Sequence, residues 1–192
     1  MTLGIVDSGA CNLRAYVNVA ETLKLDYTIV TNPDGVSECS KLVLPGVGSF
    51  GGVASGMVET GLDEAIKAAV GRGVSLLGIC AGMQILFRES DESPGVIGLG
   101  LVEGSVKRLP VVARAKINIG WSHVNGLEGD FYFVHSFHCE SSKPLEVEYK
   151  ASFGKHEFLA GFRSGNILGV QFHPEKSGKA GLQLLSRLID EM

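Results

Sequence analysis

The chain has 192 residues, of which 45% are hydrophobic and 20% are charged, a composition typical of a globular protein and not of a disordered one. This length suits one domain with a substantial core, so we expect a single domain over residues 1–192. A net charge of -4 without a basic tract argues against nucleic acid as a partner, and no apolar run predicts a membrane span or a secretion signal.

In the first half of the chain, short apolar runs alternate with amphipathic segments. We expect strands at residues 3–7, 27–31, 42–44 and 74–79, and helices at residues 13–23, at residues 65–70 and after Gly82. Asn12 stands where the N-cap of the first helix is expected. This alternation predicts an α/β fold with a mostly parallel sheet covered by helices on both faces.

The second half contains runs typical of strands joined by turns, at residues 101–106, 131–135, 145–149, 158–162 and 167–172. We expect antiparallel additions to the sheet here. The chain closes with an amphipathic helix that carries Leu182, Leu185, Leu188 and Ile189.

The cysteines are scattered and form no CxxC pair: Cys11, Cys39, Cys80 and Cys139. This spacing suits the reducing cytoplasm better than a disulfide framework. His135 and His138 with Cys139 raise the possibility of a metal site, but a second pair of ligands is missing. We therefore expect no metal and no organic cofactor, and interpret His123 and His156 as turn or surface residues.

Residues 78–82, Gly-Ile-Cys-Ala-Gly, stand where a buried strand gives way to a helix. This is the form of a nucleophile elbow with Cys80 at its strained centre. A helix N-terminus favours the thiolate, and the backbone N–H of Ala81 can stabilise an oxyanion. The alternative is a buried structural cysteine, and the glycine frame alone leaves the two interpretations even.

His173 follows an apolar run and precedes Pro174 and Glu175. Pro174 keeps His173 out of the helical region, so Glu175 can reach the imidazole and fix its tautomer, as the third member of a catalytic triad does. A surface His-Pro turn is the alternative. Both His173 and Cys80 stand at carboxyl ends of predicted strands, where open α/β sheets place their sites, and this favours the catalytic interpretation.

Residues 46–51 match G-x-G-x-x-G, but they follow the third strand, and no acidic residue ends a strand about 20 positions on. Pro45 also indicates an extended segment rather than an immediate helix. An oxyanion strand, with backbone N–H groups facing an anionic centre, explains the glycines better than a dinucleotide site does. A plain turn is not excluded by the sequence.

Together, residues 45–50 (PGVGSF), 78–84 (GICAGMQ) and 171–177 (QFHPEKS) resemble the signatures of class I glutamine amidotransferases, in order and over nearly the whole chain. Within this class, the chain most resembles the glutaminase subunit of imidazole glycerol phosphate synthase. Gly120-Trp121 and residues 132–137 carry this narrower resemblance. It implies a flavodoxin-like fold and hydrolysis of L-glutamine by a thioester at Cys80, with His173 as base and Glu175 as its orienting group.

The resemblance assigns further roles residue by residue. Gly48 and Ala81 serve the oxyanion, and the Val47 peptide flips to present its N–H. The positions that hold the amino-acid end of glutamine are Gln84, Glu92, Ser136 and Phe137. The positions that face a (βα)8-barrel cyclase, to which ammonia travels in the histidine pathway, are Asn12, Trp121 and Lys176.

Three departures from the family pattern leave the triad untouched. Residues 116–122 (KINIGWS) stand where a Pro-His-Met-Gly-Trp-Asn segment is usual, Ala81 replaces a common leucine, and Cys11 replaces a common glycine. These departures lie near the expected partner face. They leave open a paralogous subunit that feeds ammonia to a sugar-amidating synthase of surface-polysaccharide biosynthesis. A non-catalytic subunit and a cysteine peptidase or deglycase are the remaining alternatives.

Overall fold

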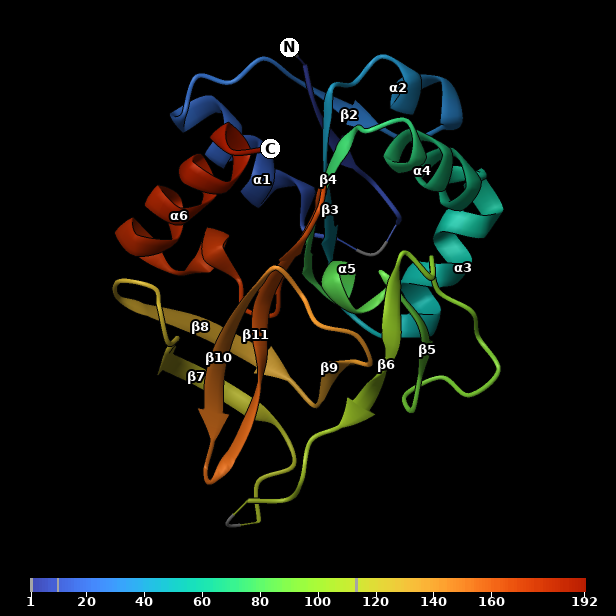
Figure 1. Ribbon diagram of the computed structural model, residues 1–192. Helices are drawn as coiled ribbons and strands as arrows, with labels where there is room; N and C mark the ends of the chain where they lie inside the picture. The colour runs from blue at the N-terminus through green and yellow to red at the C-terminus, as the bar shows by residue number, and fades with distance from the viewer. Residues whose placement is uncertain (1, 10, 113) are drawn as a thin grey trace.

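A computed structural model describes residues 2–9, 11–112 and 114–192 (Figure 1). Its central sheet has seven strands in the order β10-β11-β12-β4-β3-β1-β2. The parallel strands are β1 (Leu3–Val6), β2 (Tyr27–Val30), β3 (Lys41–Gly46), β4 (Ser75–Cys80) and β12 (Ile167–Val170). Two antiparallel strands, β10 (Val147–Phe153) and β11 (His156–Ser164), extend one edge. The predicted mixed, mostly parallel sheet is therefore confirmed.

Helices cover both faces of the sheet (Figure 1). One face carries α1 (Leu13–Thr22) and α6 (Gly178–Asp190), and the other carries α2 (Pro33–Ser37), α3 (Phe50–Thr60) and α4 (Leu62–Gly71). The central strands are apolar at successive positions because both of their faces are buried. In β3, for example, Val43 packs in the core beneath α1 and α6, whereas Leu42 and Leu44 pack in the core beneath α3 and α4.

The prediction that the second half adds antiparallel strands to the central sheet is correct for β10 and β11, whereas β12 joins the sheet parallel to β4 and the other predicted strands lie outside it. A three-stranded sheet forms from β5 (Phe87–Ser90), β6 (Val102–Arg108) and β9 (Phe137–Ser141), and a separate hairpin from β7 (Asn118–His123) and β8 (Asp130–His135). Apolar periodicity indicates a strand but not its neighbour, which tertiary packing decides. Phe87 and Phe137 pack into the core on the α3 side, and Phe131 and Phe133 into the core on the α6 side.

Two helical predictions need correction. Asn12 precedes α1, but its side chain makes no capping hydrogen bond. The helix after the elbow, α5 (Ala81–Gln84), is a single turn. None of the helices in the described part of the chain is long and apolar enough to cross a membrane.

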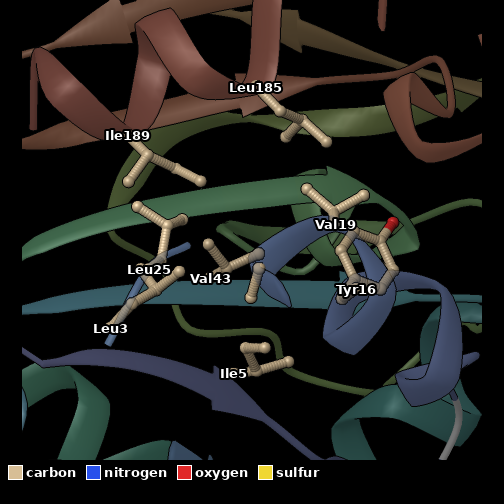
Figure 2. A pocket seen from close by; sticks show the side chains of 9 residues that line it. Leu3, Ile5, Tyr16, Val19, Leu25, Val43, Leu185 and Ile189 are labelled. Atoms are coloured by element: carbon tan, nitrogen blue, oxygen red, sulfur yellow. The ribbon is translucent and has the colours of Figure 1, made fainter. Parts of the chain in front are cut away.

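A small apolar cavity lies between α1, α6 and the sheet (Figure 2). Its volume is about 10 Å³, and Leu3, Val43, Leu185 and Ile189 are among its lining residues. The space is close to the minimum for one water molecule, and the walls offer almost no polar partner. The cavity is therefore a packing gap, and the hydroxyl of Tyr16 stands at its edge, away from Leu3 (Figure 2).

Three glycines allow the elbow to pack backbone against backbone. A Cβ on Gly82 would lie 1.9 Å from the carbonyl oxygen of Leu44, and one on Gly46 would lie 2.4 Å from the nitrogen of Gly82. A Cβ on Gly78 would lie 2.5 Å from the carbonyl oxygen of Gly82. No side chain fits at these positions, so α5 is pressed directly onto β3 and β4.

We expect Gly82→Ala to lower the free energy of unfolding by about 3 kcal/mol or more, because the clash is with rigid backbone. Gly71→Ala is the matched control, since Gly71 ends α4 and the space that the added methyl group would occupy is open. There the substitution should be neutral or stabilise by roughly 0.5–1 kcal/mol. Urea unfolding measures both, and equal effects of the two variants would contradict the packing argument.

Candidate active site

Three segments predicted from the sequence meet at the carboxyl edge of adjacent strands. Gly46 at the end of β3 pairs with Cys80 at the end of β4, and Val170 at the end of β12 pairs with Ile79. The chain segments that follow these strands therefore lie side by side. This edge is where ligands bind in open α/β sheets.

Cys80 has φ 56° and ψ -111°, a conformation that L-residues rarely adopt. Such strain persists only where the surroundings enforce it, and it is common for residues at functional sites. Cys80 is 7% exposed and directly precedes α5. Because α5 is one turn long, the full helix dipole expected from the sequence is absent, and only the free N–H groups of this turn remain to favour an anion.

His173 and Glu175 form a buried pair. His173 Nδ1 lies 2.8 Å from Glu175 Oε1, and His173 is 1% exposed. Their contact depends on a turn rather than on the extended segment expected: His173 has φ -102° and ψ 91°, and Pro174–Lys176 form the 3-10 helix η1. Ser177 fixes this turn, because its hydroxyl donates to the carbonyl of His173 and accepts from the N–H of Tyr132.

The electrostatics of the His173 ring favour its protonated form. Burial is the largest influence and lowers its pKa, but hydrogen bonds to Cys80 and Glu175 and the negative charge of both groups raise the pKa to about 9. Tyr16 on α1 lies beside the same carboxylate. Burial first, and then the charge of Glu175, raise the pKa of Tyr16 well above its ordinary value.

The segment expected to serve an oxyanion leaves β3 next to Cys80. Val47 and Gly48 are both exposed, and Gly48 has φ 112°, a conformation that favours glycine. Ala81 is buried as the first residue of α5, so no residue of that turn accepts from its N–H. Glu92 holds the end of this segment, because its Oε2 accepts a hydrogen bond from the N–H of Phe50 at 2.7 Å.

The remaining residues expected to hold glutamine come from β9 and α5. Ser136 and Phe137 join β8 to β9, and the carbonyl of Phe137 accepts from Gln84 Nε2 at 3.0 Å. Gln84 and Phe137 are thus in direct contact, whereas Glu92 bonds to the start of α3.

Comparison with known proteins agrees with this arrangement. The family profile described as glutamine amidotransferase class-I matches residues 4–191. The chain belongs to the class-I glutamine amidotransferase family. Among its relatives are proteins named imidazole glycerol phosphate synthase subunit HisH. The one from Pyrococcus furiosus is 41% identical, with 95% of each chain covered, and the one from Prochlorococcus marinus is 35% identical, with 97% of each chain covered.

Solved structures share the fold of this amidotransferase. A crystal structure of a glutamine amidotransferase has a TM-score of 0.75 at 22% identity, with 99% of each chain covered. The structure of PurLQS from Thermotoga maritima has a TM-score of 0.76 at 21% identity, with 99% of this chain and 98% of that chain covered. The predicted class I amidotransferase fold is confirmed.

The residues expected at the partner face lie in η1 or in elements linked to it. Asn12 directly precedes α1, which contacts η1, and exposed Lys176 lies within η1. The adjacent strand β8 carries Tyr132, which packs edge-to-face against Trp121 of β7. Trp121 is 57% exposed.

The departure at residues 116–122 has two different structural consequences. Ile117, just before β7, and Ile119 within it are exposed, Ile119 by 66%. Their spacing of two from each other and from Trp121 places the three residues on the same side of an extended segment. Asn118 is instead buried and bonds to His135 at 2.9 Å, so this substitution does not change the surface. The expectation that residues 116–122 depart near the partner face stays a prediction, and at Asn118 the departure lies inside the protein.

The amidotransferase also has features that the sequence did not predict. His156 is not a plain surface residue, because its Nε2 is buried without a hydrogen-bond partner among the described residues, and its ring meets that of His138 edge-to-face, with the ring centroids 5.0 Å apart. Across residues 2–9, 11–112 and 114–192, no group of three or more His, Cys, Asp and Glu side chains could hold a metal ion.

Gln171 is fully buried, and its side chain lies beside Cys80. The one sequence signal for this position is that Gln171 stands two residues before His173, so that both side chains can point to the same side of an extended segment.

Glu175→Gln should lower the pKa of His173 from about 9, because the charge of the carboxylate is lost. The raised pKa makes His173 stabilise the fold below pH 6.5, and this contribution disappears as the pH rises from 6.5 to about 9. We expect the parent to lose up to about 3 kcal/mol more over this range than Glu175→Gln does.

Nuclear magnetic resonance titration of the His173 ring and urea unfolding at pH 6 and pH 9 measure these two effects. Equal titration midpoints for His173 in the parent and in Glu175→Gln would show that the charge of Glu175 does not raise the pKa of His173.

Proposed function

We propose that this chain is the glutaminase subunit of an imidazole glycerol phosphate synthase. In this proposal it hydrolyses L-glutamine to glutamate and ammonia in the cytoplasm and passes the ammonia to a (βα)8-barrel cyclase of histidine biosynthesis. The observation that carries the proposal is the strained Cys80 beside the buried His173–Glu175 pair, in a chain that aligns over nearly its full length with subunits of that name.

The geometry supports a thioester mechanism. His173 takes the proton of the Cys80 thiol through Nε2, since Nδ1 is held by Glu175, and its raised pKa favours the resulting pair of thiolate and protonated ring. The Cys80 thiolate then attacks the carboxamide carbon of glutamine. The tetrahedral oxyanion forms beside the N–H groups of Ala81 and of the Val47–Gly48 segment. His173 then protonates the departing amine, ammonia leaves, and water that gives a proton to His173 hydrolyses the thioester to glutamate and restores Cys80.

The orientation of Gln84 supports recognition of the amino group of glutamine. Both hydrogens of its Nε2 are used, one by the carbonyl of Phe137 and one by Gln171 Oε1. Only Gln84 Oε1 is left to face a substrate, and a carbonyl oxygen can only accept. That polarity fits the α-ammonium group of L-glutamine and not its carboxylate.

An exposed apolar row supports a protein partner. Ile117, Ile119 and Trp121 stand on one side of β7, and Trp121 connects through Tyr132 to the turn that carries the base. The N–H of His173 is bonded to the carbonyl of Tyr132, so a partner that presses on β7 and β8 contacts the strand that holds His173. A large, exposed aromatic residue in such a patch is typical of an interface hot spot.

Glutamine hydrolysis by the purified chain tests the proposal, alone and with the cyclase and its nucleotide ligand. We expect hydrolysis to rise at least tenfold when the liganded cyclase is added, and to vanish in Cys80→Ser. Thioester formation at Cys80 without any stimulation by the cyclase would assign the chain to a different synthase, such as a sugar-amidating one. Peptide turnover without glutamine turnover would indicate a peptidase.

Ile119→Asp should weaken binding to the cyclase more than tenfold, because it places a charge in the apolar row. Val58→Asp is the matched control, since Val58 is 63% exposed on α3, on the opposite face of the sheet. Isothermal titration calorimetry measures both affinities. Equal losses for the two variants would show that β7 is not the docking surface.

A further inference from the structure

A chain of buried amide hydrogen bonds ends at the Cys80 sulfur. Gln171 Nε2 lies 3.7 Å from Cys80 Sγ, and Gln171 Oε1 accepts from Gln84 Nε2 at 3.1 Å. The same Gln84 Nε2 donates to the carbonyl of Phe137 at 3.0 Å. Gln171 is fully buried, and Gln84 is nearly so.

The direction of each hydrogen bond in this network follows from the acceptor farthest from Cys80. The carbonyl of Phe137 can only accept, so Gln84 must present its NH2 group to it. The second hydrogen of that group then requires an acceptor, which fixes Gln171 with its oxygen toward Gln84. The NH2 group of Gln171 is thereby left facing the sulfur, and the orientation of both amides is determined by the network.

The network extends to a second buried side chain beyond Phe137. His135 Nδ1 lies 2.8 Å from the same carbonyl oxygen, and His135 Nε2 lies 2.9 Å from Asn118 Nδ2. Since the amide of Asn118 donates to Nε2, the ring donates from Nδ1, and the carbonyl of Phe137 has both acceptor positions filled. Burial, the main cause, lowers the pKa of His135 to about 4, so the ring stays neutral and keeps these directions.

We propose that Gln171 is a positioning residue for the nucleophile: its amide N–H donates to the Cys80 sulfur, favours the thiolate and holds it facing His173, and Gln84 fixes the direction of that amide. A hydrogen bond to a charged acceptor is stronger than one to a neutral acceptor, so the donor stabilises the thiolate more than the thiol. Gln171 and His173 are two residues apart, and they supply the sulfur with two separate donors.

This inference deepens the proposed function and rests on it, because Gln84 is also the residue expected to touch glutamine. A substrate ammonium held by Gln84 Oε1 would polarise the same amide whose N–H bonds to Gln171. Binding of the amino-acid end is thus connected through two side chains to the sulfur that attacks the other end. The reactivity of Cys80 without any substrate tests the first part of this connection independently of glutamine turnover.

The experiment measures the rate at which iodoacetamide alkylates Cys80 between pH 5 and pH 10, with the modified peptide quantified by mass spectrometry. Cys11→Ser is the common background, because Cys11 is the one cysteine that is only half-buried. Gln171→Met keeps the length and approximate volume of the side chain but removes the donor. We expect its alkylation rate at pH 7 to fall about tenfold and its pH profile to move to higher pH.

Gln183→Met is the matched control, since it removes the same amide from an exposed position on α6 and should leave the profile unchanged. Gln84→Met is the second test, in case Gln171→Met does not fold. It leaves Gln171 in place but frees its amide to rotate, so the rate at pH 7 should fall about threefold. A folded Gln171→Met or Gln84→Met with the parent's profile would overturn the proposal, whether or not the chain hydrolyses glutamine.

Discussion

The contact between α5 and the ends of β3 and β4 is the constraint on which the site depends. Gly46, Gly78 and Gly82 bring three stretches of backbone together without any side chain between them. This close packing holds Cys80 at φ 56°, a strained conformation that would relax if the turn could move away from the sheet. The strain is maintained by packing over the whole elbow, and the buried Met83 and Leu44 anchor the two sides.

A second consequence of this packing is electrostatic. Because the elbow places Cys80 at the edge where β12 also ends, the sulfur meets groups that come from the other end of the sequence. His173 is held by Glu175 on one side and bonded through its N–H to Tyr132 on the other. The nearby sulfur and the nearby carboxylate raise its pKa, whereas burial alone would lower it. The charges of the site therefore come together because β12 lies next to β4 in the sheet.

The parallel core could be predicted from sequence because its strands are short, apolar and separated by amphipathic helices. The positions of β6 to β9 could not, since an apolar run such as residues 131–135 fits a central strand and a peripheral hairpin equally well. The segment around α3 contains Gly51, Gly52 and Gly56, which weaken any helical signal, and its helix is stabilised by Phe50, Val53 and Met57 in the core. Tertiary packing therefore determines both the positions of β6 to β9 and the formation of α3.

The meeting of Cys80, His173 and Glu175 was predictable because each of them lies in a local motif whose backbone geometry follows from Gly or Pro. The amide network was not, because Gln84 and Gln171 are 87 residues apart and each looks like an ordinary polar residue in an apolar run. Asn118 shows the same difficulty, since nothing in its own segment indicates that it bonds to His135 inside the protein. Buried polar groups must be satisfied together, so the role of each one follows from its partner and not from its own position in the sequence.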